Sequence, residues 1–270
     1  MKQKILTGLI IGLLSTSVLA GNDIKINQAA DSSTSSIKIQ QTNSSTAQGV
    51  SSAIAEVNQL GGVNNIANIS QIDATSSQAI MTQEGDNQTS NILQKNVDNA
   101  IARTQQSGSA NEANINQESR DGVSSNLFAS ISQNGQANLA NINQLDSTGV
   151  SSIINQTGNN NSSTTSQYLA TNSQINIDIL GDNNNTQSFQ ENSSNDTTSI
   201  NITGSDNTLI TQQGNIDFAS SNNILSYNAA GTGNSSTLSQ YGSDNTMDVT
   251  QNGTNNTVTA CQGSVAACGN

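Results

Sequence analysis

Polar and apolar residues alternate along short stretches of this chain with a period of two. Segments 111–117 and 138–144 are near copies in which Asn, Ala, Ile and Gln occupy every second position. A period of two predicts a β-strand with these four residues on one face. The predicted inward residues of the two strands are Asn111, Ala113, Ile115 and Gln117, and Asn138, Ala140, Ile142 and Gln144.

Half of this predicted inward face consists of side-chain amides. A buried amide without a partner costs about 1–3 kcal/mol. Strands stacked about 4.8 Å apart let identical Asn or Gln side chains hydrogen bond to one another. The pattern therefore predicts that each strand belongs to one layer, or rung, of a stack.

Glutamines recur along the chain at intervals that fit such rungs. Most steps are 23 residues long and some are 27, and two interleaved series indicate two strands per rung. A fixed period in the twenties is typical of solenoids. We expect an all-β fold, a β-solenoid (β-helix) of strand-turn-strand repeats, with about eleven rungs and a height on the order of 50 Å. The first series is Gln48, Gln71, Gln94, Gln117, Gln144, Gln167, Gln190 and Gln213; the second is Gln83, Gln106, Gln133 and Gln156, then Ile179 and Ile202 at expected Gln positions; Gln251 and Gln262 end the pattern.

Glycines follow many strands of the second series at a fixed offset, often with Asn three residues later. Gly and Asn tolerate positive φ, so this spacing predicts recurring tight turns. The spacing does not fix the register in residues 29–60 and 214–235. The predicted turn glycines are Gly85, Gly108, Gly135, Gly158, Gly181, Gly204, Gly242 and Gly253.

Composition and charge restrict the class of protein. The chain has no Pro, Trp or His, and aromatic residues make up 2% of it, so it cannot build a large apolar core. Residues 1–20 are typical of a secretory signal peptide, with Lys2 and Lys4 before a short apolar run; a membrane anchor is the competing interpretation, but the run is about half a bilayer span. Residues 21–270 then form one domain. Removing Lys2 and Lys4 changes the net charge from -12 to -14, which argues against a nucleic-acid partner.

Cys261 and Cys268 are the two cysteines of the chain. In an oxidising compartment they would form a small terminal loop, although a free pair or an intermolecular bond is also compatible with the sequence. Two thiols and no His give too few ligands for a structural zinc site.

The repeat resembles the curlin repeat of curli, the extracellular amyloid fibres of bacterial biofilms. Its pattern is nearly intact in Ser125, Leu127, Ala129, Ile131, Gln133, Gly135, Asn138, Ala140, Ile142 and Gln144. The resemblance implies a fimbrium-like fibre subunit of the biofilm matrix that supports cell adhesion, with no catalysis, cofactor or small-molecule substrate. It implies passage through the periplasm to an extracellular fibre at the cell surface. The implied partners are further copies of the chain, other curlin-type subunits including a nucleator, a curli-type secretion channel and periplasmic chaperones. Major subunit and nucleator remain alternatives.

Two other classes of function compete with a fibre subunit. A monomeric secreted β-solenoid could bind Ca²⁺ or ice or act as an adhesin, and the repeated Gly-Ser-Asp-Asn at 204–207 and 242–245 offers oxygen ligands. Those segments also fit ordinary Asp/Asn turns, and the G-G-x-G-x-D repeat of Ca²⁺-binding solenoids is missing. A polysaccharide-cleaving β-helix enzyme needs acids clustered with other proton-transfer groups, which the five basic residues of segment 21–270 do not supply.

Overall fold

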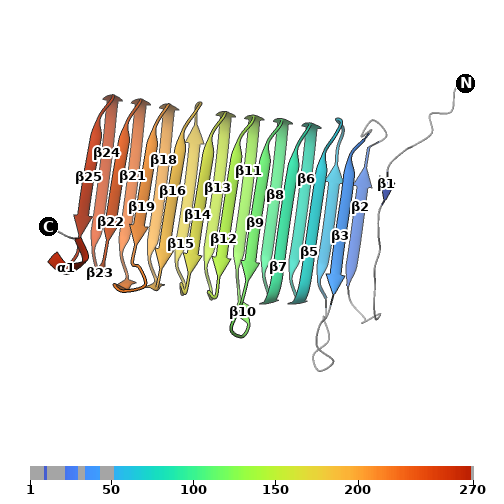
Figure 1. The fold of residues 1–270 in the computed structure, drawn as a ribbon, viewed down its shortest axis with the longest axis horizontal. Coiled ribbons are helices and arrows are strands. Elements are labelled where there is room, and N and C mark those ends of the chain that lie inside the picture. The colour runs from blue at the N-terminus through green and yellow to red at the C-terminus, as the bar shows by residue number, and fades with distance from the viewer. Residues whose placement is uncertain (1–8, 11–21, 30–33, 43–51, 269–270) are drawn as a thin grey trace, which may run out of the picture.

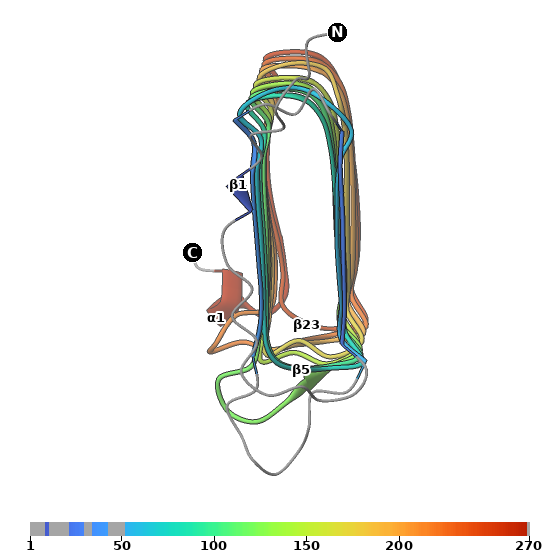
Figure 2. The same ribbon diagram turned by 90° about the vertical axis from the view of Figure 1, so that its right-hand side faces the viewer.

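The chain is wound into a stack of parallel strands. The computed structural model describes residues 9–10, 22–29, 34–42 and 52–268. Figure 1 shows the strands side by side along the long axis, and Figure 2, which looks along that axis, shows two facing walls joined by turns. The predicted β-solenoid is confirmed.

Two large sheets form the walls, and all their strand pairs are parallel. The ten-stranded sheet contains β2 (Asp23–Gln28), β4 (Ile54–Gln59), β6 (Gln78–Asp86), β8 (Ile101–Ser109), β11 (Phe128–Gln136), β13 (Ser151–Asn159), β15 (Gln174–Leu180), β18 (Thr197–Ser205), β21 (Ile224–Thr232) and β24 (Thr246–Thr254). The twelve-stranded sheet contains β1 (Leu9–Ile10), β3 (Ser36–Thr42), β5 (Ile66–Thr75), β7 (Thr89–Asp98), β9 (Glu112–Glu118), β12 (Leu139–Leu145), β14 (Ser162–Tyr168), β16 (Asn185–Glu191), β19 (Thr208–Gln213), β22 (Ser235–Gln240) and β25 (Thr257–Gln262), with β10 (Ser124–Ser125) paired to β7.

Each strand of the ten-stranded sheet is followed by a strand of the other wall, which makes ten rungs among the described residues. The expected eleven was too many because the first connections are long. Gln28 pairs with Gln59 and Gln41 pairs with Gln71, at separations of 31 and 30 residues. The prediction that Gln48 begins the first series was therefore wrong: Gln41 holds that position, and Gln48 lies outside the described residues.

Burial alternates along each strand as the period of two predicts. In β9, Ala113, Ile115 and Gln117 are buried, whereas Asn114 and Asn116 between them are partly exposed. The inward residues of both walls form one long apolar cluster that runs through the stack. Ala and Ile thus fill the space between the walls, and the amides lie at its margins.

A third set of short strands lines one narrow edge of the stack. It contains β17 (Ser193–Ser194), β20 (Ser220–Ser221) and β23 (Gly242–Ser243). Beside this edge a second apolar cluster contains Ala74, Val97, Ala100, Leu127, Val150 and Ala170. The turns of this edge are therefore packed in layers as the walls are.

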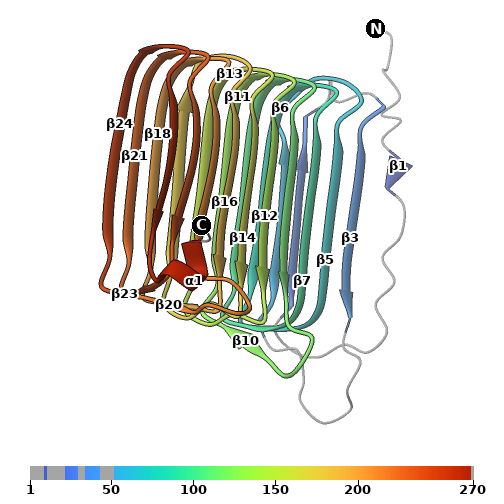
Figure 3. The same ribbon diagram turned by 60° about the vertical axis from the view of Figure 1, so that its left-hand side comes forward.

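The two ends of the stack differ. At the C-terminal end, a short helix, α1 (Val265–Cys268), lies outside the wall of the twelve-stranded sheet and not across the rung (Figures 2 and 3). At the N-terminal end, β1 pairs with β3 at Ser36 and Ile37; the rest of the predicted signal peptide at residues 1–20 lies outside the described residues. No helix in the described part of the chain is long and apolar enough to cross a membrane.

Candidate functional site: amide ladders and turn glycines

Glutamine side chains form a continuous ladder along the twelve-stranded wall. Nε2 of each Gln donates to Oε1 of the next, at 2.8 Å from Gln117 to Gln144 and 3.0 Å from Gln144 to Gln167. Gln144 Nε2 also donates to the backbone carbonyl of Phe128 in the other wall, at 2.8 Å. Each buried amide is therefore partnered both along the stack and across it. The ladder contains Gln41, Gln71, Gln94, Gln117, Gln144, Gln167, Gln190, Gln213, Gln240 and Gln262.

A second glutamine ladder follows the ten-stranded wall over its first six rungs. It links Gln28, Gln59, Gln83, Gln106, Gln133 and Gln156 at 3.0–3.1 Å, again with donation toward the C-terminal end. Gln156 then donates to Ser163 Oγ at 2.9 Å, because Ile179 occupies the next position. This ladder therefore stops inside the molecule, whereas the first one spans it.

The rungs with Ile in place of Gln carry a compensating polar face. Ile175, Ile177 and Ile179 of β15 are buried, and the inward residues of the following strand are Thr186, Ser188 and Gln190. Thr186 Oγ1 donates to Ser163 Oγ at 2.8 Å, and Thr211 Oγ1 donates to Ser188 Oγ at 2.8 Å. The hydroxyls are thus satisfied by neighbouring rungs while the opposite strand supplies the apolar filling.

Asparagines at the turn form a third file. Asn138 Nδ2 donates to Asn111 Oδ1 at 3.1 Å and to the carbonyl of Gly158 at 2.8 Å. The backbone N–H of Asn138 also donates to Asn111 Oδ1. Asn at this position therefore fixes the turn to the turns on either side of it.

The turn glycines stack directly on one another. Gly135 has φ of 137°, and a Cβ placed on it would lie 1.9 Å from the carbonyl oxygen of Gly158. Only a residue without a side chain fits such a stack. The file contains Gly62, Gly85, Gly108, Gly135, Gly158, Gly181, Gly204, Gly231 and Gly253.

One predicted turn glycine does not belong to this file. Gly242 lies in β23 at the other narrow edge and pairs with Ser220, because the Gln240 that precedes it belongs to the twelve-stranded wall. Gly231 holds the turn position, in register with Gly204 and Gly253. The spacing of glutamines does not reveal Gly231 because Ala229 stands where Gln was expected.

A buried carboxyl that no sequence pattern singles out lies beside the short strands. Asp196 is fully buried; its Oδ1 accepts the backbone N–H of Asn223 at 2.7 Å and its Oδ2 accepts the hydroxyl of Ser220. Burial raises the pKa of the Asp196 carboxyl, and the hydrogen bonds from Ser220 and Asn223 oppose that rise. Asp196 is thus a titratable group in a file of otherwise uncharged residues.

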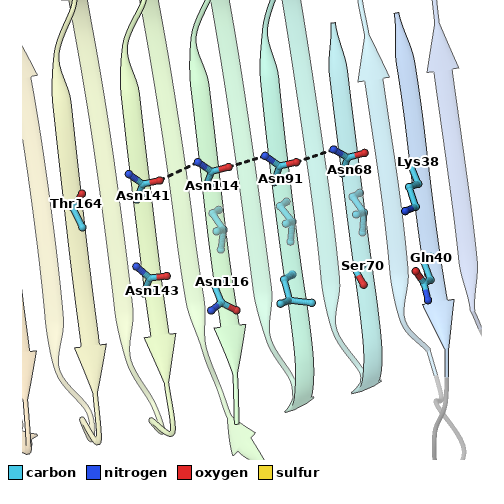
Figure 4. Close-up of a pocket in the computed structure, with 14 residues that line it drawn as sticks. Lys38, Gln40, Asn68, Ser70, Asn91, Asn114, Asn116, Asn141, Asn143 and Thr164 are labelled. Carbon is cyan, nitrogen blue, oxygen red and sulfur yellow. Dashed lines mark hydrogen bonds between the residues drawn. The ribbon is translucent and has the colours of Figure 1, made fainter. Parts of the chain in front are cut away.

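An outward-facing ladder crosses the twelve-stranded wall. Asn68 donates to Asn91, Asn91 to Asn114 and Asn114 to Asn141, at 2.7–3.0 Å, along a shallow pocket of about 630 Å³ (Figure 4). The wall therefore repeats the same amide contact on its solvent side. Within the described ranges no group of three or more His, Cys, Asp or Glu could hold a metal ion.

The C-terminal rung carries the disulfide and the last glutamines. A disulfide joins Cys261 of β25 to Cys268 of α1. Gln251 Oε1 accepts hydrogen bonds from Tyr227 Oη at 2.6 Å and Ser236 Oγ at 2.7 Å. Nε2 of Gln251 has no partner among the described residues although the residue is 3% exposed. The predicted residues Gln251 and Gln262 thus lie together on the terminal rung.

The fold and the ladders define a parallel β-solenoid whose repeats are joined by side-chain amides. The sequence model of the curlin associated repeat matches residues 230–253, so this segment of the chain is similar to a curlin associated repeat. No curated protein sequence matches the chain. The matched segment runs from one stacked turn glycine, Gly231, to the next, Gly253, and the strand register connects it to the earlier rungs. The matched repeat and the fold fit a curli-like structural subunit.

Proposed function

We propose that the protein is the subunit of a curli-like extracellular amyloid fibre and that it polymerises by adding copies at the open ends of its stack. The observation that carries this proposal is the continuous glutamine ladder of the twelve-stranded wall, which makes the same bond at every internal step from Gln41 to Gln262. A further copy could extend the ladder without any new kind of contact. Each added copy then pairs the free hydrogen-bonding groups of one strand edge and exposes a new edge of the same kind.

The open strand edges support the same function. β2 and β24 end the ten-stranded wall, and α1 lies beside the last rung and not over it (Figure 2). Soluble solenoids usually cover their ends with atypical polar repeats. Strand edges left free in this way are templates for another chain.

The remaining parts of the proposal follow from the curlin repeat. We infer that residues 1–20 are removed on export and that the mature chain reaches the cell surface through the periplasm by a curli-type channel, with periplasmic chaperones keeping it unassembled. Other curlin-type subunits, including a nucleator, are the proposed partners. Fibres of this kind would support adhesion and the biofilm matrix, with no catalytic step.

Fibre formation by the exported chain tests the proposal. Purified protein should give thioflavin-positive fibres with a meridional reflection near 4.8 Å, and preformed fibres should abolish the lag. A chain that stays monomeric for days by size-exclusion chromatography at high concentration would instead favour a monomeric binding solenoid.

A further inference from the structure

The hydrogen-bond direction of the glutamine ladders makes the two ends of the stack chemically different. In both ladders Nε2 of the more N-terminal Gln donates to Oε1 of the more C-terminal one. The glutamines of the C-terminal rung therefore end in donors: no described residue accepts from Nε2 of Gln251 or Gln262. The N-terminal rung ends in acceptors, because no described residue donates to Oε1 of Gln28 or Gln41.

We propose that copies of this chain join head to tail in one register, with Gln251 and Gln262 of one copy donating to Gln28 and Gln41 of the next and with Asp248 beside Lys25. The inference rests on the proposed fibre function and names its contact surface. Its occupant is a second copy of the chain. In the glutamine ladders donors meet acceptors only in this order, whereas two C-terminal ends would bring the glutamine donors together.

The register follows from continuing the pairing seen inside the molecule, where Gln lies on Gln in parallel strands. Placing Gln251 over Gln28 puts Met247 over Ile24 and Val249 over Ile26. Ile24 and Ile26 are 36% and 41% exposed, and Val249 is a partly buried residue at the end of the core. The joint therefore covers apolar surface that the single copy leaves open.

On the other wall the same rule places Val258 over Ile37 and Ala260 over Ile39. Val258 and Ala260 are partly buried and pack on the core from its last rung. Both walls of one copy thus present apolar residues at the positions where the next copy presents isoleucines. The match on two walls at once is a stronger constraint than a match on one.

Charge complements this register. Asp248 is exposed on the last rung, and Lys25 is exposed on the first, where its Nζ lies 3.1 Å from Asp23 Oδ2. In the register above, Asp248 and Lys25 are neighbours on the outer face. No Lys or Arg follows Arg120 in the sequence, whereas Lys25 and Lys38 both lie on the first rung. The N-terminal end of one copy therefore attracts the C-terminal end of another, whereas two like ends do not attract each other.

Zero-length crosslinking tests the contact. The exported chain is used, with its N-terminus determined by mass spectrometry, because β1 of the full chain occupies the edge of β3. Fibres grown from a mixture of ¹⁴N and ¹⁵N chains are treated with a carbodiimide, which joins an amine to a carboxylate in contact. Lys25 and Asp248 lie nine steps apart within one copy, about 43 Å at 4.8 Å per step, so they cannot react within a monomer.

We expect a Lys25–Asp248 crosslink of mixed isotope composition in fibres, absent from freshly dissolved monomer and lost in Asp248→Asn. Lys38 is the matched control, because the residue over it is Thr259 and no carboxylate lies there. Lys25→Glu should slow seeded elongation about two- to fivefold at low salt, and adding Asp248→Lys to it should restore the rate. Lys38→Glu should leave the rate closer to that of the unaltered chain.

The possible results distinguish a failure of the head-to-tail contact from a failure of the proposed fibre function. Fibres in which Lys25 crosslinks only to acids of other rungs, or to Asp248 only within chains of one isotope, would overturn the head-to-tail register and leave the fibre function standing. A chain that forms no fibres at all would overturn both. A charge reversal at Lys25 that Asp248→Lys does not rescue would also count against the register.

Discussion

Replacing Gly135 by Ala tests whether close stacking of the turns holds the rungs in place. A Cβ at Gly135 would lie 1.9 Å from the carbonyl oxygen of Gly158, whereas ordinary contact begins at 3.4 Å, so one turn must move by 1.5 Å. The neighbouring hydrogen bond from Asn138 Nδ2 to that carbonyl is 2.8 Å long. A shift of this size breaks it, because hydrogen bonds beyond about 3.5 Å contribute little.

Gly122 is the matched control for the backbone strain. Its φ of 118° is also in the region that L-residues avoid, but nothing lies within 4 Å of the point that a Cβ on Gly122 would occupy. Gly122→Ala should therefore cost only the backbone strain, about 1–3 kcal/mol. Gly135→Ala should cost the same strain plus an overpacking penalty of about 1–3 kcal/mol.

Urea unfolding of freshly dissolved protein, followed by far-ultraviolet circular dichroism, measures the difference. The free energy of unfolding of Gly135→Ala should fall below that of Gly122→Ala, and its fibres should nucleate more slowly. Equal losses in the two variants would refute the reasoning, because they would mean that the stacked carbonyl exerts no steric pressure on this position.

Three further predictions concern the buried polar groups and the surface charge. Gln144→Leu should lower the free energy of unfolding by about 3 kcal/mol, because it removes three hydrogen bonds from the ladder, whereas Asn143→Leu on the outer face should change it by less than about 0.5 kcal/mol in the same urea titration. The pKa of Asp196 is raised in the folded state, so the fold favours the protonated carboxyl. This contribution to the free energy of unfolding is complete below the unfolded pKa of 3.8, and it is lost as the pH rises through the pKa of the folded state. Asp196→Asn should therefore raise stability at pH 7 and flatten the pH dependence in a thermal melt; unchanged pH dependence would contradict this. Acid pH or Ca²⁺ should shorten the thioflavin lag by reducing repulsion between carboxylates, and a lag indifferent to both would reject that explanation.

The alternation of residue types was enough to predict which side chains face inward. Asn111, Ala113, Ile115 and Gln117 are all buried, because a strand with one buried face leaves no freedom in its side-chain directions. Identical amides at equal spacing also indicated that the rungs stack in register. These features are local or strictly periodic, and the sequence displays them directly.

The features that escaped prediction depend on breaks in that period. The first connections are long, so the spacing that works elsewhere suggested Gln48, although Gln41 pairs with Gln71. Ala229 in place of Gln hid the turn at Gly231. The role of Asp196 depends on Ser220, which is 24 residues away on another turn, and no local pattern relates the two.

The glutamine amides of both ladders point the same way along the stack, so these ladders contribute an electric dipole along its axis. Each N–H···O=C bond polarises the next, and such chains strengthen by about 10–30% per bond. The positive pole lies at the rung that holds Asp248 and the negative pole at the rung that holds Lys25 and Lys38, so the fixed charges oppose the field that the amides create. A column of many copies would accumulate this polarisation, and its tip would attract the next subunit more strongly than an isolated molecule does.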